Sequence, residues 1–313
     1  MTASYFLGVD GGGTKTEFLC IDDGGRELAR ARTGTTYHLQ VGLDGAKAAL
    51  SEGVGAICAA LSITPADIAF AFVGLPAFGE DKATDPLLDT ACAALLGHDR
   101  YRCANDMVCG WAGSLACEDG INLVAGTGSI GYGRRGSVEA RTGGWGEVFS
   151  DEGSAYWIAV QGLNAFTRMS DGRLPRGPLH AAFVDALSLT NDLDICAKTM
   201  GSGGLGRDGI AALAPIVSSA AAAGDPAALA ILTQAARELF AIATSLRAQL
   251  GYATGERAAF SWSGGVVQRQ DVVRETLRQL LNENGQFEVV EPRWSPVEGA
   301  ARYARLLSRA TAG

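Results

Sequence analysis

Short apolar runs of strand length open the chain and are separated by turns. The runs lie at residues 5–9, 17–21 and 27–32; glycines follow the first run, and Asp23–Gly24 follows the second. Asp-Gly between two apolar runs is a hairpin signal, and a glycine-rich link between strands favours a second hairpin. The pattern therefore predicts an antiparallel meander of three strands.

Hydrophobic spacing then alternates between helix and strand. Apolar periodicity at residues 43–61 and 83–96 predicts two helices. A continuous apolar run at residues 68–73, and another that ends at Asn105, predict buried strands. The first lobe is thus expected to be α/β, with three hairpin-linked strands followed by alternating helices and strands.

The same order of elements begins again at residue 121. An apolar strand reaches Val124, a glycine-rich turn follows at Gly126–Gly128, and two short strands lie around Ile130 and Val138. We interpret this as an internal duplication. Two facing units of strand and glycine turn would form a two-sided clamp for phosphate groups.

From Ser154 onward the pattern is mostly helical. Apolar residues from Leu229 to Leu250 alternate spacings of three and four, which predicts a helix with one face in the core. The remaining elements are expected as a strand at 258–262, a helix at 272–281, a strand at 287–290, and a last helix that starts near Pro296 with Ser295 as N-cap and Glu298 completing a capping box.

The length of 313 residues allows two lobes of ordinary size. We expect an N-terminal lobe of residues 1–115, onto which the helix 296–313 packs back, and a C-terminal lobe of residues 116–295. Hydrophobic residues make up 47% and charged residues 19%, a globular balance without a long membrane-helix run. The net charge of −8 lacks the basic surface that non-specific nucleic-acid binding requires.

Cysteines and histidines show no metal-ligand spacing. The cysteines are odd in number and scattered, which argues against a disulfide framework or a zinc site: Cys20, Cys58, Cys92, Cys103, Cys109, Cys117 and Cys196. The histidines are His38, His98 and His180. Residues 1–4 lead into the first apolar run without a basic signal-peptide region, so we expect a cytoplasmic protein with reduced thiols.

The first glycine-rich turn carries a candidate phosphate site. Asp10 ends a predicted strand, and Gly11–Lys15 lead into the next strand, whereas the Walker and Rossmann motifs lead into a helix with other spacings. Glycines let backbone N–H groups close around phosphate oxygens, and Asp10 could hold magnesium through water. A plain hairpin turn is the alternative, although it does not require three glycines and a strand-terminal aspartate.

Two further turns repeat this chemistry. Gly126–Ser129 offers backbone donors and two hydroxyls after an apolar strand, and Gly264–Val266 ends another strand where a flat ring such as adenine could pack. An ordinary β-turn is the alternative for each.

Two acidic positions could carry sugar chemistry. Asp106 follows a predicted strand and precedes a helical stretch, so it is either a helix N-cap or the general base of a phosphoryl transfer. Trp145 and Asp151 lie in a glycine-flanked segment before a helix, and an aromatic face with a carboxylate suits a sugar. A loop whose polar residues cap the next helix would look the same.

The ordered set of these motifs resembles the eukaryotic-type N-acetylglucosamine kinase family, which shares an ATPase domain with activators of 2-hydroxyacyl-CoA dehydratases. The motifs are Asp10-Gly-Gly-Gly-Thr-Lys-Thr, Asn105-Asp, Ala125-Gly-Thr-Gly-Ser, Gly143-Gly-Trp-Gly, Asp151-Glu-Gly-Ser-Ala-Tyr-Trp and Ser263-Gly-Gly-Val. The resemblance implies a two-lobed actin-like ATPase (ribonuclease H-like) fold with duplicated lobes and a cleft between them. It also implies ATP-dependent phosphorylation of an amino sugar at its 6-hydroxyl, most readily N-acetylglucosamine, in a homodimer.

The resemblance also assigns residues to each ligand, and it favours the base over the cap for Asp106. The implied phosphate-binding residues are Gly11, Gly12, Gly13, Thr14, Lys15, Gly126, Thr127, Gly128 and Ser129, and the implied magnesium residue is Asp10, through water. The implied adenosine-binding residues are Gly264, Gly265 and Val266. The implied sugar-binding residues are Thr36, Tyr37, Asn105, Asp106, Gly144, Trp145, Asp151 and Ala155.

One position departs from the family pattern. Tyr37 stands before His38 where the family's sugar loop commonly has an asparagine. A phenol replaces an amide's donor and acceptor, so glucosamine or N-acetylmuramic acid remain alternative substrates. Two other classes are weighed: an iron–sulfur ATPase activator, disfavoured because residues 122–125 before the second turn hold no cysteine, and a non-catalytic sensor, disfavoured by the presence of both Asp10 and Asp106.

Overall fold

Two compact units make up the chain. The computed structural model describes residues 4–200 and 203–311. Unit 1 comprises Met1–Glu118 and Glu291–Gly313, and unit 2 comprises Asp119–Val290. The first boundary lies three residues after the expected one, and the second lies five residues before it, because the non-helical segment 291–295 ahead of the last helix also belongs to unit 1.

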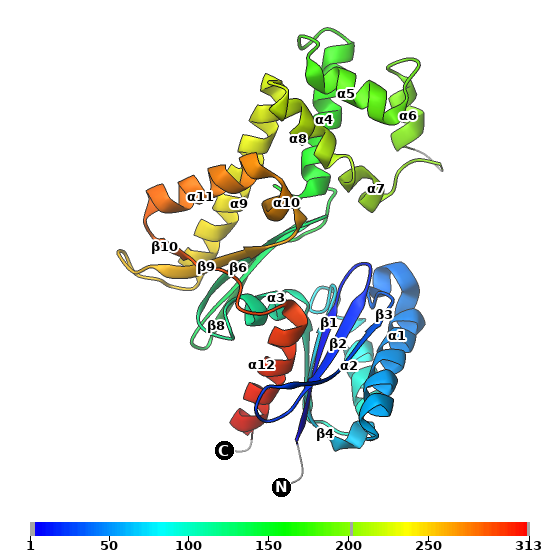
Figure 1. Ribbon diagram of the computed structural model, residues 1–313, viewed down its shortest axis with the longest axis vertical. Coiled ribbons are helices and arrows are strands. Elements are labelled where there is room, and N and C mark those ends of the chain that lie inside the picture. Colours follow the sequence, from blue (N-terminus) through cyan, green and yellow to red (C-terminus); the bar gives the residue numbers. More distant parts are fainter. Residues whose placement is uncertain (1–3, 201–202, 312–313) are drawn as a thin grey trace. The chain divides into compact units, whose positions relative to one another are not determined.

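Unit 1 contains a five-stranded sheet in the order β3-β2-β1-β4-β5. Its strands are β1 (Tyr5–Gly11), β2 (Thr16–Ile21), β3 (Glu27–Thr33), β4 (Ile68–Leu75) and β5 (Tyr101–Asn105), and Figure 1 labels the first four. The first three are antiparallel neighbours, which confirms the predicted meander, and β1, β4 and β5 are parallel. The carboxyl ends of those three parallel strands therefore meet at one edge of the sheet.

Helices cover the sheet of unit 1. They are α1 (His38–Leu61), the short 3-10 helix η1 (Pro65–Asp67), α2 (Asp85–Leu96), α3 (Met107–Ser114) and α12 (Pro296–Thr311). The apolar faces of α1 and α2 pack with β1, β2 and β4 in one core. Helix α12 contacts β1, β4 and α3, and a side chain at Gly8 would come within 2.2 Å of the Ala301 backbone nitrogen.

The ends of two helices follow local signals. The predicted role of Glu298 at the start of α12 is confirmed, since its Oε2 accepts from the Ser295 N–H at 3.0 Å and from the Ser295 hydroxyl at 2.6 Å. The helix predicted from residue 43 is the part of α1 that follows Gly42, whose non-helical φ of 72° and ψ of 169° separate it from the first turn at residues 38–41.

Unit 2 repeats the sheet of unit 1. Its strands are β6 (Gly120–Ala125), β7 (Ser129–Arg135), β8 (Val138–Gly143), β9 (Ala258–Ser263) and β10 (Phe287–Val289). Read from β8, their order is β8-β7-β6-β9-β10, which is the order of β3-β2-β1-β4-β5 in unit 1. Three antiparallel strands are again followed by two parallel additions. The expected duplication therefore exists at the level of strand order.

The helices of unit 2 pack on this sheet and on one another (Figure 1). They are α4 (Ala155–Ser170), α5 (Pro178–Leu187), α6 (Asp194–Thr199), α7 (Arg207–Ala211), α8 (Ala214–Ala222), α9 (Pro226–Gln249), α10 (Gly265–Arg269) and α11 (Asp271–Asn284). Helix α9 is long and apolar enough to cross a membrane by length and composition, but its apolar stripe lies in the core of unit 2. Leu229, expected in that stripe, is 49% exposed in the first turn.

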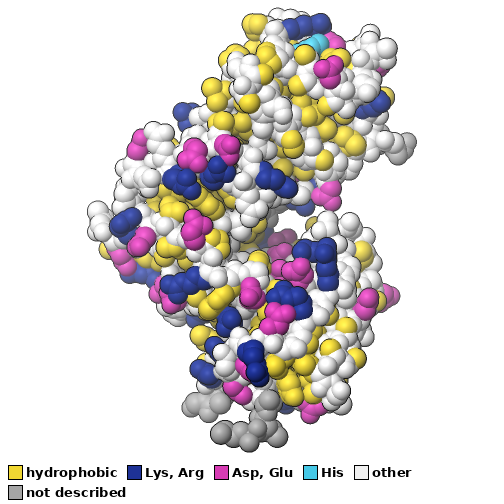
Figure 2. Space-filling view, viewed as in Figure 1, with side chains coloured by type: hydrophobic (Ala, Val, Ile, Leu, Met, Phe, Trp, Pro, Cys, Tyr) yellow, Lys and Arg dark blue, Asp and Glu magenta, His cyan; other side chains and the backbone are white. Residues whose placement is uncertain are grey.

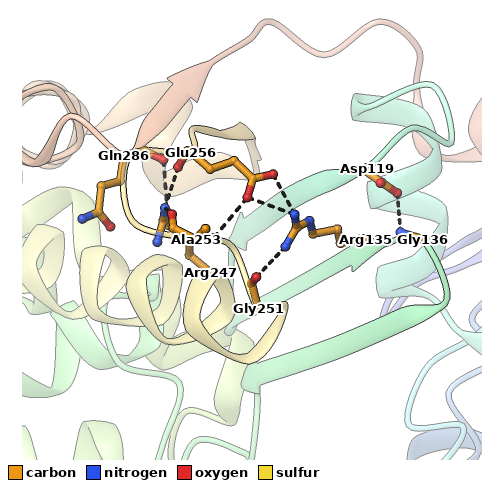
Figure 3. Close-up of polar contacts among 8 residues, drawn as sticks. All are labelled: Asp119, Arg135, Gly136, Arg247, Gly251, Ala253, Glu256 and Gln286. Atoms are coloured by element: carbon orange, nitrogen blue, oxygen red, sulfur yellow. Dashed lines mark hydrogen bonds and ion pairs between the residues drawn. The ribbon is translucent and has the colours of Figure 1, made fainter.

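A buried arginine joins the carboxyl end of α9 to the sheet of unit 2 (Figure 3). Arg247, 7% exposed, donates from Nη2 to the carbonyl oxygens of Ala253 at 2.6 Å and Glu256 at 2.5 Å. Its Nε donates to the carbonyl oxygen of Gln286 at 3.4 Å. The Glu256 carboxylate in turn accepts from Arg135 of β7 at 2.8 Å, so that the loop before β9 is fixed from both sides.

Charges of both signs are interspersed on the visible surface. Lys, Arg, Asp and Glu side chains alternate with apolar ones over the face that Figure 2 shows. Three large apolar side chains are exposed close together in sequence in the segment after β8, namely Trp145 (73%), Val148 (84%) and Phe149 (76%). That segment belongs to the candidate site.

Candidate active site

The first glycine-rich turn connects β1 to β2 as a hairpin. The Gly12 N–H donates to the Lys15 carbonyl oxygen at 2.8 Å and closes the turn. Gly13 and Thr14 at its tip are exposed, and within the described residues their N–H groups donate to no protein acceptor. Two adjacent backbone donors that point to solvent form a small concave anion-binding surface.

Asp10 lies at the end of β1, beside Asp106. In the sheet Asp10 pairs with Gly74 of β4, and a side chain at Gly74 would come within 3.3 Å of the Asp106 Cα and 2.3 Å of Cys109 Sγ. Burial, together with the negative charges of Asp106 and Glu17, raises the pKa of Asp10 to about 8, although the Cys109 thiol and the charge of Lys15 act in the opposite direction. Lys15, which pairs with Glu17 at 2.6 Å, therefore does not offset burial and the repulsion between the carboxylates.

Asp106 occupies the N-cap position of α3, but its side chain makes no capping hydrogen bond. The neighbouring Asn105 caps the helix instead, since its Oδ1 accepts from the Met107 N–H at 3.2 Å. The Asn105 amide also donates to the Phe78 carbonyl oxygen at 3.2 Å, and the residue is 6% exposed. Asn105 thus holds the start of α3, and the Asp106 carboxylate is not committed to the helix end.

The predicted sugar loop is attached to the glycine turn. Thr35 donates from Oγ1 to the Gly12 carbonyl oxygen at 2.7 Å and accepts from the Tyr37 N–H at 2.9 Å. Thr36 is fully buried, with its hydroxyl 3.2 Å from that of Thr16 and 2.4 Å from where a side chain at Gly11 would begin. Thr35 therefore joins the partly exposed Tyr37 to the glycine turn.

The second glycine-rich turn connects β6 to β7 in unit 2. Its carbonyl oxygens at Gly126 and Thr127 accept the N–H groups of Ala155 and Tyr156 at 2.9 and 3.2 Å, so the first turn of α4 holds it. The Ser129 hydroxyl donates to the Glu152 carbonyl oxygen at 2.7 Å. As in unit 1, within the described residues the amides of the two residues at the tip donate to no protein acceptor.

The third turn lies against the second. Gly264 follows β9 with a left-handed φ of 99°, and a side chain there would come within 2.3 Å of the Ala125 carbonyl oxygen. Glycine is therefore required both by conformation and by the approach to β6. Val266 is 2% exposed and packs in the core, so only the backbone of this turn is available to a ligand.

Asp151 lies beside the second turn. It adopts a left-handed φ of 58°, which aspartate tolerates better than most residues, and it is 2% exposed. A side chain at Gly128 would come within 2.6 Å of Asp151 Oδ2. Unit 2 thus brings a predicted sugar carboxylate and a predicted phosphate turn into direct contact.

Gly144 and Trp145 precede Asp151 on the same segment. Gly144 has φ of 70°, and a side chain there would come within 2.7 Å of Ile130. The Trp145 ring is largely exposed, and the Arg141 guanidinium carbon lies 5.9 Å from its centroid. An exposed aromatic face and a buried carboxylate on one segment suit the apolar and polar surfaces of a sugar ring.

Sequence reasoning missed Arg207 of α7. Its Nη2 donates to Asp151 Oδ2 at 2.7 Å, and its Nε lies 3.2 Å from Glu147 Oε2. It is separated from Asp151 by 56 positions and belongs to no recognisable motif, so no spacing could have indicated the contact.

Asp10 and the carboxylates near it suit a cation that keeps its water ligands better than a metal ion bound by protein groups alone. No group of three or more His, Cys, Asp or Glu residues with metal-binding geometry occurs within residues 4–200 and 203–311. Magnesium with ATP usually keeps several waters and takes one or two carboxylates. Asp10, whose pKa is raised by burial and by two neighbouring carboxylates, fits such a cation because a nearby positive charge would favour its ionised form.

Comparison with known proteins identifies relatives over almost the whole chain. Residues 7–304 match the BadF/BadG/BcrA/BcrD ATPase family. The N-acetyl-D-glucosamine kinase of Dictyostelium discoideum is 30% identical over 97% of this chain and 98% of its own. An N-acetylmuramic acid/N-acetylglucosamine kinase of Clostridium acetobutylicum is 29% identical over 90% and 91%, and the glucosamine kinase GspK of Vibrio cholerae is 26% identical over 96% of both chains.

Solved structures agree on the fold. A structure from Chromobacterium violaceum has a TM-score of 0.71 at 23% identity, with 96% of this chain and 99% of that chain covered. A ROK family glucokinase from Streptomyces griseus, in complex with glucose and AMPPNP, has a TM-score of 0.57 at 17% identity, with 98% and 100% covered. The expected two-unit α/β fold of actin-like ATPases and sugar kinases is confirmed.

Proposed function

Since this chain belongs to the BadF/BadG/BcrA/BcrD ATPase family, we propose that it is an ATP-dependent kinase that phosphorylates the 6-hydroxyl of an amino sugar, N-acetylglucosamine first. The whole-length similarity to three amino-sugar kinases supports the reaction class. The observation that carries the proposal is the pair Asp10 and Asp106, held at the carboxyl ends of parallel strands beside an open glycine turn.

The phosphates of ATP are assigned to the two glycine-rich turns, Gly11–Lys15 and Gly126–Ser129. Each turn leaves adjacent backbone N–H groups without a protein acceptor within the described residues, and each adds hydroxyl groups. Such donors are suited to phosphate oxygens whose negative charge grows during transfer. The backbone of Gly264 and Gly265 is assigned to adenosine because it adjoins the end of β6.

Asp106 is assigned as the base. The sugar hydroxyl oxygen forms a bond to the γ-phosphorus, the bond from that phosphorus to the leaving oxygen of ADP breaks, and the hydroxyl proton passes to the Asp106 carboxylate. Asn105 supports this role because it takes over the capping of α3. The buried Cys109 thiol next to both carboxylates donates to the Val9 carbonyl oxygen at 3.5 Å and helps to fix the end of β1.

Magnesium is assigned to Asp10, through water, together with the phosphates of ATP. When bound, the cation supplies charge neutralisation at the phosphate oxygens. Asp10 would hold the hydrated cation, and the charge of the cation would favour the ionised form of Asp10 against the rise of its pKa to about 8.

The sugar is assigned to Asp151, Trp145, Gly144 and Ala155 of unit 2 and to Tyr37, Thr36 and Asn105 of unit 1. Since Thr36 and Asn105 are buried and hydrogen-bonded, their contribution is to hold Tyr37 and Asp106 in place. Tyr37 offers one hydroxyl in place of an amide, so glucosamine and N-acetylmuramic acid are the alternative substrates. We place the reaction in the cytoplasm, where ATP is available, and in a homodimer.

The test is ADP release from magnesium-ATP with N-acetylglucosamine, glucosamine, N-acetylmuramic acid, glucose or no sugar. We expect N-acetylglucosamine to stimulate turnover most strongly and to yield the 6-phosphate. Stimulation by another amino sugar would change the substrate but keep the reaction. ADP release that no sugar stimulates would reject the kinase.

A further inference from the structure

We propose that Arg207 is a catalytic residue that donates hydrogen bonds to the γ-phosphate of ATP, and that Asp151 and Glu147 hold it in position. The inference rests on the proposed kinase function and adds a residue to its site. It concerns unit 2 alone, in which the three side chains and the second glycine turn lie together.

The guanidinium lies directly against the second glycine turn. A side chain at Gly128 would come within 2.5 Å of Arg207 Nη2 and within 2.6 Å of Asp151 Oδ2. A guanidinium therefore lies beside the turn whose open N–H groups are assigned to phosphate. Guanidinium groups bind phosphate well because their planar donors match two phosphate oxygens at once.

Most of the donors of Arg207 remain available. A guanidinium has five N–H groups. In the described parts of the chain Arg207 makes one side-chain hydrogen bond, from Nη2 to Asp151, and one further ion pair, from Nε to Glu147. The Arg207 side chain is 38% exposed, whereas that of Asp151 is 3% exposed, so the pair has a buried anchor and an open donor end.

Stability alone does not explain why both Asp151 and Glu147 pair with the Arg207 guanidinium. Asp151 already has its charge compensated by Arg207, and Glu147 at 33% exposure could be solvated by water without a partner. Together the two carboxylates contact two different nitrogens and so fix the plane of the guanidinium. A guanidinium that is held in a fixed plane can stabilise the charge that develops during the reaction, because it does not have to reorganise first.

In the proposed step Arg207 transfers no proton. The sugar oxygen bonds to the γ-phosphorus, the bond to ADP breaks, and the proton goes to Asp106; Arg207 donates hydrogen bonds to non-bridging oxygens as their negative charge rearranges. Removal of one such donor lowers kcat by about 100-fold to 1,000-fold in comparable sites.

The test compares ADP binding with the binding of ADP plus fluoroaluminate, which mimics the transferring phosphoryl group. We expect Arg207→Met to leave the Kd of magnesium-ADP nearly unchanged and to weaken the ADP–fluoroaluminate complex by about 100-fold, with a similar loss in kcat. Arg207→Lys keeps the charge and should recover part of the loss. Glu147→Gln keeps Arg207 and Asp151 and should cost far less than Arg207→Met.

One outcome would overturn the proposal. If Arg207→Met and Arg207→Lys bind ADP and ADP–fluoroaluminate in the wild-type ratio, while the KM for sugar rises, Arg207 only orients Asp151. Thermal unfolding of both variants shows whether either has lost its fold. If Arg207→Met has lost it, Arg207→Lys is compared with the wild type instead. The binding ratio is measured first without sugar, so failure of the kinase assay and failure of the Arg207 assignment give separate results.

Discussion

Two glycines of the same turn should respond in opposite ways to alanine. A side chain at Gly128 would meet Arg207 and Asp151 at 2.5 and 2.6 Å, whereas a side chain at Gly126 would meet nothing within 4 Å. Neither glycine is among those with positive φ, so alanine is compatible with the backbone at both positions. The pair therefore isolates one variable, which is the contact between the turn and the Arg207–Asp151 ion pair.

The size of the difference follows from the contacts. Alanine in place of glycine at a compatible position stabilises a protein by about 0.4–1 kcal/mol, because the unfolded chain loses freedom. In Gly128→Ala this gain is opposed by loss of a charged hydrogen bond, about 1.5–3 kcal/mol when buried. Because Arg207 is 38% exposed we take the lower part of that range, about 2 kcal/mol.

Thermal unfolding measures the outcome. We expect Gly128→Ala to unfold at a lower temperature than wild type and Gly126→Ala at an equal or slightly higher one. A difference of about 2 kcal/mol corresponds to about 4–8 °C for a unit of this size. The KM for sugar should also rise in Gly128→Ala, since Asp151 must move. Equal melting temperatures and equal KM values for the two variants would show that Arg207 and Asp151 adapt to the extra methyl group.

Three further predictions concern the base, the sugar loop and the core of unit 2. Asp106→Asn should lower kcat by about 100-fold to 10,000-fold with little change in the KM for sugar, and near-wild-type turnover would remove Asp106 from its role. Tyr37→Asn should raise the ratio of kcat/KM for N-acetylglucosamine over glucosamine, because an amide supplies both a donor and an acceptor; an unchanged or lower ratio would place Tyr37 outside sugar recognition. Arg247→Met should destabilise the protein by about 3 kcal/mol, measured by denaturant unfolding, because it leaves three carbonyl oxygens without their donor. The exposed Arg237→Met on the same helix is its control, and equal losses would contradict the network.

The sheets could be predicted because short sequence signals mark the turns between their strands. The Asp23–Gly24 hairpin and the glycine turns after β1 and β6 are signals that a few adjacent residues carry, and the structure has those turns at the expected places. The same signals gave the family, which the match over residues 7–304 confirms. Because strand order repeats between the units, prediction of one meander also helped to predict the other.

The helices were less predictable where packing overrides periodicity. Periodicity indicated α1 from residue 43, where its regular part begins, but not the turn at residues 38–41, which the non-helical Gly42 separates from it. Leu229 fits the apolar stripe of α9 by spacing, yet it is 49% exposed, and Ala228 is the residue of the first turn that is buried in the core. The short helices α6 and α7 have five or six residues, too few for a periodic pattern to be recognised.

Asp106 shows why the sequence alone could not decide the site. Asn and Asp are both good N-cap residues, and Asn105 and Asp106 both precede α3, so either could have satisfied its first N–H groups. The structure assigns the cap to Asn105 through Met107 and leaves Asp106 beside Asp10 and Cys109. Asn105 and Asp106 are adjacent and chemically similar, but Asn105 caps α3 and Asp106 does not. Only the direction of their side chains distinguishes them. The case for Asp106 as a base rests on its place beside Asp10, at the carboxyl ends of the parallel strands of unit 1.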